Sequence, residues 1–479
     1  MNKKWLLINP PTGKYIRDTR CQASVDDAFA ISARAPVDLA YIAGAIAKNG
    51  HTYYIKDYPV EGLEWDDMLR DIETLKIDYI VINTTIFSFE EDLKVCGACK
   101  NIDKRIVTTA KGAIFFNDSE KIMSDYPALD IAIANEEEKA FEEISSQTKK
   151  LNEIRNITYR ENNIIIKNPK HIGSDFKLSV PKIEQIKHEL YRRPDTDEMQ
   201  ATIVVGRGCP GKCIYCVASM VGGHIARYRV VNDIIDEIKL YYLNHGINNF
   251  YFSADTFTWN HKWVKEFCEA IDQLDFKISW LCTARADRIT SELIMKMKFA
   301  GCWGLSIGIE SGNEQIQEYI KKNLTKQNIT DAIKICKKHK MVTLLHFMFG
   351  FPWDSEETVK ETIRLAKKSK GNIMEFYIVT PLPGTELYEI IKNDPKLRLS
   401  ESTEGLNQNT TTTDTYYLAA QRLKILQKKA LRSTYLNPLF YINSLRYIRS
   451  FSQLIRCVKF TFRKIFYIVF KRKHKNGGG

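Results

Sequence analysis

The sequence predicts an α/β protein: a doubly wound, Rossmann-like domain, then a six-unit partial (β/α) barrel, then a helical tail. Three observations support this fold class. Short β-rich runs alternate with amphipathic helical stretches in two separate series, a polar stretch with prolines divides the series, and the end of the chain abandons the alternation. We place the domains at 1–145, 201–400 and 401–479, with 146–200 as a linker that packs on both domains.

The first series begins with the strand WLLIN, which ends in Asn9-Pro10, and continues with a helix over 36–50. Further strands are expected within 51–58, 79–85, 105–113 and 130–138. Ligands of open doubly wound sheets lie beyond the carboxyl ends of the strands. We therefore expect a binding crevice, lined by Asn9, Pro10, Thr84, Thr85, Lys111, Gly112 and Glu136.

In the linker, ITYRENNIIIKN reads as a β-hairpin with Glu161-Asn162-Asn163 at its turn. The second series then supplies six strand–helix repeats, which predict a parallel barrel or a fragment of one. Its expected strands are 202–206, 249–253, 277–282, 304–309, 342–349 and 374–379, with helices between them such as 230–246 and 291–301.

Three cysteines stand close together in GRGCPGKCIYCVA, directly after the first barrel strand. Cys209, Cys213 and Cys216 have the spacing C-x3-C-x2-C. A four-iron cluster normally takes four thiolates, so three leave one iron open to another ligand. The alternatives are a zinc knuckle, a cluster with a distant fourth cysteine, or chance. Zinc needs a fourth ligand, and the nearest histidine, His224, lies eight residues beyond Cys216.

This motif, with Tyr215 directly before the last cysteine, resembles that of the radical S-adenosylmethionine (SAM) superfamily. The resemblance implies that Cys209, Cys213 and Cys216 hold a four-iron four-sulfur cluster whose open iron binds SAM, and that Tyr215 is one of the cofactor-binding residues. It also implies reductive cleavage of SAM to a 5′-deoxyadenosyl radical, in a six-unit partial barrel with the cluster loop after its first strand.

Candidate SAM contacts follow the next three barrel strands. Asp255 follows the second, Arg285 the third, and Glu310 and Ser311 the fourth, where Gly308 to Gly312 resembles a ribose and carboxylate contact of the family. Each has a structural alternative: Asp255 could cap a helix, Arg285 could pair with a surface acid, and Glu310 could accept from backbone donors. Their places after successive strands favour the binding role.

A doubly wound domain before such a barrel resembles the cobalamin-binding subclass, which includes the anaerobic magnesium-protoporphyrin ester cyclase and hopanoid-modifying proteins. NPP after the first strand and APVDLAYIAGAIAKNGH carry this resemblance, which implies bound cobalamin. The chain departs from some members, since NPPTGKYIRD stands where they carry Asp-x-His-x-x-Gly, and Lys111-Gly112-Ala113 replaces a Gly-Gly pair. A Rossmann-like domain with another ligand, or none, is the alternative.

The net charge of +12 belongs to the tail. From Arg422 onward there are fifteen Lys or Arg and no Asp or Glu, and the rest of the chain carries 55 basic and 58 acidic side chains. In residues 420–475 the hydrophobic residues also recur at helical spacing, and aromatic side chains are frequent. This pattern favours peripheral contact with a membrane. Nucleic acid is a less favoured partner, and packing of the apolar face on the barrel is the third interpretation.

Eleven cysteines, with only WLLI as an apolar stretch near the start, indicate the cytoplasm and no secretory signal. We expect peripheral contact with the inner face of the membrane and a flavodoxin or ferredoxin as electron donor. The leading hypothesis is C-methylation of a lipid or another small molecule at an unactivated carbon. Alternatives are a cyclase or oxidative enzyme of the same subclass, a tRNA-modifying radical SAM enzyme, and a non-catalytic metal-binding scaffold.

Overall fold

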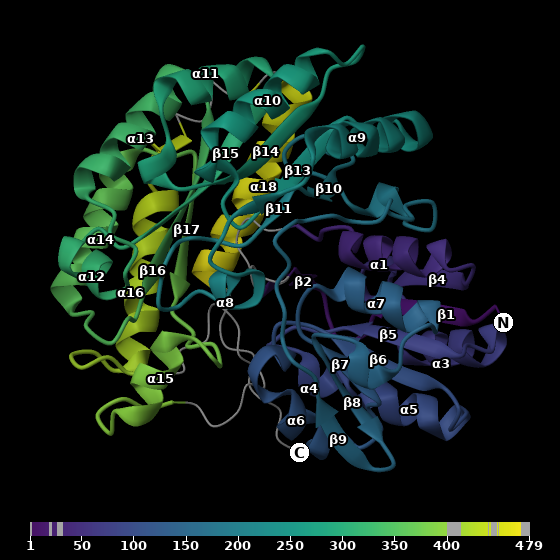
Figure 1. Cartoon of the computed structure of the whole chain (residues 1–479). Coiled ribbons are helices and arrows are strands. Elements are labelled where there is room, and N and C mark those ends of the chain that lie inside the picture. Colours follow the sequence, from purple (N-terminus) through teal and green to yellow (C-terminus); the bar gives the residue numbers. More distant parts are fainter. Residues whose placement is uncertain are drawn as a thin grey trace.

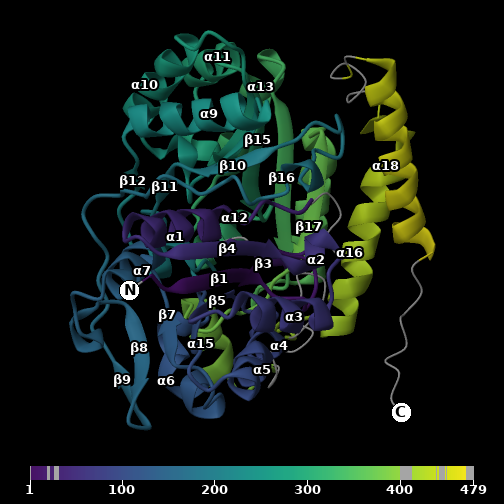
Figure 2. The ribbon, with the colours of Figure 1, turned by 90° about the vertical axis from the view of Figure 1, so that its right-hand side faces the viewer.

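The computed structural model describes residues 2–18, 22–25, 32–399, 413–438, 440–441, 448 and 450–470. It contains two large sheets, one mainly and one wholly parallel, each with its own helices, and two long C-terminal helices beside the second sheet (Figures 1 and 2). The predicted fold class is confirmed, and the basic residues 471–475 of the expected membrane segment lie outside the described residues.

The N-terminal sheet is parallel through its first five strands. In spatial order its strands are β4 (Thr52–Asp57), β1 (Lys4–Asn9), β5 (Tyr79–Asn83), β6 (Val107–Lys111), β7 (Ile131–Ile133), β8 (Ile157–Glu161) and β9 (Ile164–Lys167). The predicted hairpin is β8–β9; it pairs antiparallel with β7 and so extends this sheet, although we had assigned it to the linker.

Helices cover both faces of this sheet, which explains why β1 reads as a continuous apolar run. Trp5 and Leu7 pack on one face and Leu6 and Ile8 on the other. The first face is covered by α1 (Val37–Lys48) and α7 (Glu137–Ser146). The second face is covered by α3 (Trp65–Leu75), α5 (Lys94–Ile102) and α6 (Phe115–Asp125), with the short helices α2 (Tyr58–Glu61) and α4 (Phe89–Asp92) at strand ends.

The second sheet is a six-stranded parallel barrel that stays open between its edge strands, β10 and β17. Its strands are β10 (Ala201–Val204), β13 (Asn249–Ser253), β14 (Ser279–Ala284), β15 (Cys302–Glu310), β16 (Val342–Phe349) and β17 (Ile373–Ile378). Its helices are α9 (Val231–His245), α10 (His261–Asp272), α11 (Ser291–Phe299), α12 (Glu314–Tyr319), α13 (Lys326–Lys338), α14 (Glu356–Ser369) and α15 (Glu386–Asn393).

Strand β16 shows how the sequence builds a hollow barrel. In VTLLHFMF the side chains of Thr343, Leu345, Phe347 and Phe349 are buried, whereas the residues between them are only partly buried. Successive side chains of a strand point to opposite faces. The buried set packs under the helices, and the partly buried set faces an interior cavity.

Two small two-stranded sheets, which the sequence did not reveal, lie where the domains meet. The pair β2 (Tyr15–Arg17) and β3 (Gln22–Ser24) follows the first strand of the N-terminal sheet. The pair β11 (Gly206–Arg207) and β12 (Arg227–Tyr228) encloses the cysteine motif and the short helix α8 (Ala218–Gly222).

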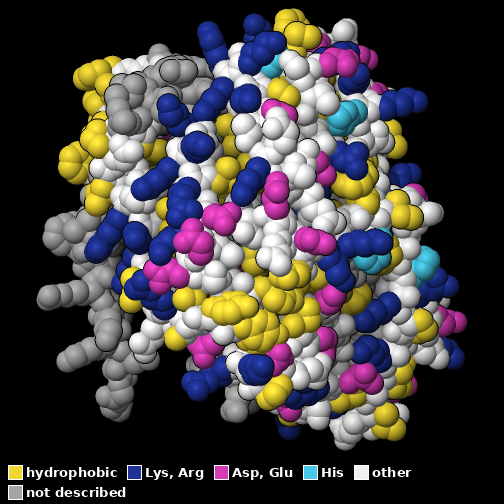
Figure 3. All heavy atoms as spheres, turned by 90° about the vertical axis from the view of Figure 1, so that its left-hand side faces the viewer, with side chains coloured by type: hydrophobic (Ala, Val, Ile, Leu, Met, Phe, Trp, Pro, Cys, Tyr) yellow, Lys and Arg dark blue, Asp and Glu magenta, His cyan; other side chains and the backbone are white. Residues whose placement is uncertain are grey.

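The tail forms α16 (Ala420–Tyr435) and α18 (Phe451–Phe470), which lie side by side next to the barrel (Figure 2). Helix α16 packs against β17, where Gln427 donates a hydrogen bond to the Phe376 carbonyl over 2.7 Å. Among the described residues, no helix has the length and apolar character to cross a bilayer. On the face that carries α13 and α14, acidic side chains interrupt the Lys and Arg, and hydrophobic side chains gather in one patch (Figure 3).

Candidate active site

The cysteine motif forms a tight loop over the carboxyl end of β10. Gly208 has a φ of +87°, and a side chain there would approach the Ile225 carbonyl oxygen to 2.1 Å, so the turn requires glycine. The Gly208 amide donates to Asp255 Oδ2 over 2.6 Å, and the Cys209 amide donates to the Gly223 carbonyl over 2.9 Å. These bonds fix the loop before the first cysteine.

The sulfurs of Cys209 and Cys213 both lie close to Gly211. A carbon added to Gly211 would lie 3.3 Å from Cys209 Sγ, 3.9 Å from Cys213 Sγ and 3.6 Å from Arg285 Nη1. Backbone amides also face the sulfurs: Gly211 N lies 3.4 Å from Cys209 Sγ, and Ala218 N lies 3.5 Å from Cys216 Sγ. Partly exposed cysteine sulfurs with amide donors and a neighbouring guanidinium fit an iron–sulfur cluster, since such donors tune it.

All three cysteines line one cavity of about 1410 Å³ that runs through the open barrel. Small-molecule sites typically measure about 300–1,000 Å³, so this cavity has room for more than one bound group. Of the predicted SAM contacts, Tyr215, Asp255, Arg285 and Glu310 line it as well. Ser311 is buried outside the cavity lining, and its hydroxyl lies 3.3 Å from that of Thr362.

Glu310 is the most constrained of these residues. Its backbone adopts φ +64° at the end of β15, and its carboxylate accepts hydrogen bonds from Lys322 Nζ at 2.5 Å and from the Tyr215 hydroxyl at 3.2 Å. Glu310 and Lys322 are both buried. Burial, with the nearby Glu310 charge, raises the pKa of Tyr215 well above its ordinary value, so the phenol stays a hydrogen-bond donor.

Arg285 is held beside the cysteines by two partners. It pairs with Asp287, with a shortest distance of 3.0 Å, and donates to the Lys322 carbonyl over 3.0 Å. The pKa of Arg285 is raised despite its burial, first by Asp287 and also by the thiols of Cys213 and Cys209. A fixed cation there suits a carboxylate bound next to the cluster.

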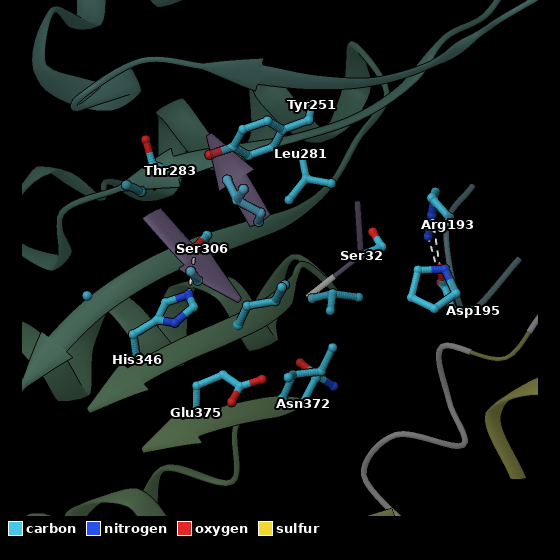
Figure 4. Close-up of a pocket in the computed structure, with 18 of the residues that line it drawn as sticks. Ser32, Arg193, Asp195, Tyr251, Leu281, Thr283, Ser306, His346, Asn372 and Glu375 are labelled. Carbon is cyan, nitrogen blue, oxygen red and sulfur yellow. Dashed lines mark hydrogen bonds and ion pairs between the residues drawn. The ribbon is translucent and has the colours of Figure 1, made fainter. Parts of the chain in front are cut away.

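Below the cluster loop, polar side chains from three neighbouring strands meet in the barrel interior (Figure 4). His346 Nε2 lies 2.7 Å from Ser306 Oγ, and its Nδ1 lies 3.2 Å from the Tyr377 hydroxyl. The buried Glu375 lines the same part of the cavity. Sequence reasoning missed these residues, although His346 is the one polar residue at an interior position of β16.

The predicted crevice residues of the N-terminal domain contact protein groups rather than the large cavity. Thr84 donates to the Lys111 carbonyl over 2.8 Å, Lys111 Nζ lies 3.3 Å from Asp38, and Glu136 pairs with Arg227 at 2.7 Å. A side chain on Gly112 would approach Thr84 Oγ1 to 2.4 Å. Asn9 and Glu136 line a smaller cavity of about 80 Å³ between the domains, whereas Pro10 and Thr85 line neither cavity.

Other residues form the N-terminal wall of the large cavity. They come from the β2–β3 hairpin, from the segment before α1 and from the turn after β5: Ile16, Gln22, Ala23, Ser32, Arg34, Ile86 and Phe87. This wall lines the same cavity as the cysteines, and Ile16, Ala23, Ile86 and Phe87 give it an apolar part. The sequence carried no signal for it, because the hairpin strands have three residues each.

Comparison with known proteins agrees with this geometry. Residues 203–366 match the family model of the radical SAM superfamily. An uncharacterized methyltransferase of Pyrococcus horikoshii is 28% identical over 445 residues, which cover 91% of this chain and 93% of that protein.

Two solved structures share the fold at 14% identity. The cobalamin-dependent radical enzyme OxsB, with aqua-cobalamin and SAM bound, has a TM-score of 0.71 over 98% of this chain and 72% of its own. The methyltransferase TsrM from Kitasatospora setae, with cobalamin and a [4Fe-4S] cluster bound, has a TM-score of 0.66 over 84% of this chain and 78% of its own.

Proposed function

Because this chain is a radical SAM enzyme, we propose that it cleaves SAM reductively and methylates an unactivated carbon of a lipid or another small molecule, with cobalamin as second cofactor. The observation that carries the proposal is the position of the three cysteines at one end of a cavity large enough for SAM, a second cofactor and a substrate. Cyclisation or oxidation of the same substrate is the second candidate, since the radical chemistry is shared.

Cys209, Cys213 and Cys216 would hold the cluster, which when bound supplies the electron for SAM cleavage. Arg285, fixed by Asp287, would bind the SAM carboxylate, and Glu310 would accept from its amino or ribose groups. The apolar wall that includes Ile86 and Phe87 would hold the corrin face. Lys111, from the expected crevice, lies 3.3 Å from Asp38 and lines neither cavity, so it would not hold the cofactor.

The substrate would occupy the barrel interior below these groups. Leu281, Leu344 and Met348 line that space together with the polar group around His346. An amphiphilic molecule fits this mixture, because its apolar part contacts the first set and a hydroxyl or carboxyl contacts the second. The basic, aromatic tail supports a lipid substrate and work at the inner face of the membrane.

Anaerobic reconstitution tests the proposal. Wild-type protein should bind about four irons per chain, release 5′-deoxyadenosine from SAM after reduction, and show a cobalamin spectrum when that cofactor is supplied. Cys213→Ala should lose the iron and the deoxyadenosine, whereas Cys99→Ala, in a buried cysteine of α5, should keep both. Full cleavage without bound cobalamin would contradict the methyl-transfer part alone.

A further inference from the structure

Helix α18 forms a side wall of the active-site cavity. The partial barrel is open between β10 and β17, and the described side chains of α18 line the same cavity as His346 and Glu375. These side chains include Gln453, Leu454, Cys457 and Thr461. In Figure 1 the helix runs behind the barrel strands from end to end. The tail therefore completes the cavity that the six strands leave open.

The same helix carries a second, solvent-exposed apolar face. Phe451, Ile455, Val458 and Phe462 are 76, 42, 44 and 70% exposed. With about 3.6 residues per turn, their spacing places them in one stripe, next to the face that holds Leu454 and Cys457. Exposed hydrophobic side chains in such a continuous stripe mark an interaction site more often than scattered ones do.

The stripe borders the mouth of the cavity. Val458 and Phe462 are exposed and also belong to the cavity lining, which includes Phe440 and Tyr441 between α16 and α18 as well. An apolar molecule that contacts the stripe from outside is therefore next to side chains that also line the interior. Hydrophobic side chains also project from the edge of the molecule on which α18 lies (Figure 3).

The charge of this segment selects the partner. Lys459 is exposed beside the stripe, Arg456 is partly exposed, and no acidic residue occurs after Arg422 in a segment with fifteen basic ones. An apolar stripe flanked by cations is the pattern of helices that lie in the surface of an anionic bilayer. Nucleic acid would use the cations but leave the exposed Phe and Ile without a role.

We propose that α18 is a membrane-docked gate: its apolar stripe lies in an anionic bilayer, and an amphiphilic substrate passes from the lipid along Val458 and Phe462 into the barrel. This gate proposal rests on the proposed function in one respect only, that the cavity is the site of the reaction. It assigns the tail to two tasks, closing the barrel and admitting the substrate.

Vesicle co-sedimentation tests the docking face. Full-length protein should bind phosphatidylcholine vesicles that contain phosphatidylglycerol. Phe451→Ser/Phe462→Ser should reduce binding by about tenfold or more, because it removes two phenyl groups that the bilayer would bury. The matched control is Leu243→Ser/Phe299→Ser, which removes two side chains that are 76 and 83% exposed on α9 and α11. Serine leaves the charge unchanged, so the comparison isolates the apolar contact. Equal binding by both double variants, or tighter binding to RNA than to vesicles, would overturn the proposal.

Cys457 provides a natural reporter for the entry route. Among the described cysteines outside the cluster motif it alone is partly exposed, and it lines the cavity. In cluster-loaded protein, a dodecyl maleimide carried in anionic vesicles should modify Cys457, and the stripe variant should slow this reaction about tenfold while N-ethylmaleimide reacts at the wild-type rate. Unchanged dodecyl labelling in the stripe variant would refute entry beside the stripe.

These measurements separate the two proposals. If the protein binds iron but does not cleave SAM, and docking and Cys457 labelling succeed, the proposed chemistry is wrong and the gate survives as a lipid-binding device. If chemistry succeeds and both vesicle measurements fail, the cavity takes its substrate from solution.

Discussion

Breaking the ion pair between Lys322 and Glu310 should destabilise the protein far more than breaking a surface pair one residue away. Lys322 Nζ lies 2.5 Å from Glu310 Oε1, and the two side chains are 7 and 9% exposed. Lys322→Met removes the cation beside the buried Glu310 carboxylate. That carboxylate then keeps its hydrogen bond from the Tyr215 hydroxyl at 3.2 Å. Removing one partner of a buried pair costs about 3–5 kcal/mol.

The neighbouring Lys321 offers a matched control. It pairs with Glu386 at 2.6 Å, but these side chains are 48 and 49% exposed, so Lys321→Met should cost about 0–1 kcal/mol. Glu310→Gln/Lys322→Met should recover much of the lost stability, because it removes the uncompensated charge. Thermal unfolding of the four proteins without cofactors gives the order directly. A melting temperature of Lys322→Met equal to that of Lys321→Met would refute the buried-charge reasoning.

Three further predictions concern the site and the fold. His346→Ala should abolish substrate modification but leave 5′-deoxyadenosine formation within a factor of about ten, measured by liquid chromatography, because His346 lies among interior strand residues away from the cluster loop. Burial raises the pKa of Asp354 to about 6, so native stability should fall as pH rises from about 4 to 6, by about 3 kcal/mol, and Asp354→Asn should flatten that slope in urea unfolding. Gly44→Ala should lower the melting temperature, since its methyl group would approach the Val180 carbonyl oxygen to 2.2 Å, whereas Gly97→Ala in α5 should not.

The barrel was the most predictable part of the molecule, because each unit repeats a local pattern. The expected strand 342–349 coincides with β16, and the expected helix 230–246 exceeds α9 by one residue at each end. The three cysteines were recognised from their spacing, and the glycines around them indicated a tight turn, which Gly208 makes with a φ of +87°. Such features depend on neighbours in sequence, which a single chain reveals.

The cavity wall and the tail were less predictable because they depend on packing between distant segments. Nothing in QAS, the sequence of β3, indicates that Gln22 and Ala23 face the barrel. The tail was interpreted by its charge and aromatic content as a membrane segment, whereas part of α18 lines the barrel cavity. The spacing of hydrophobic residues along a helix shows that the helix has an apolar face, but it does not identify what covers that face.

The acidic turn 136–138 illustrates how the two domains fix the geometry of the site. It belongs to the N-terminal domain, yet Arg207 of the barrel pairs with Glu138 through two bonds of 2.6 and 2.8 Å, and Arg227 pairs with Glu136 at 2.7 Å. Hydrophobic contact between domains has little directional preference, whereas a two-bond arginine–carboxylate pair forms in one orientation.

Arg207 stands two residues before Cys209, so the pair connects the N-terminal domain directly to the cluster loop. The apolar wall at Ile86 and Phe87 and the cysteines are therefore held at a fixed separation across the cavity. Glu138→Gln should weaken this connection while leaving each domain folded. We expect it to reduce substrate modification more than SAM cleavage, which depends on the barrel alone. Equal loss of both activities would show instead that Glu138 supports the cluster loop itself.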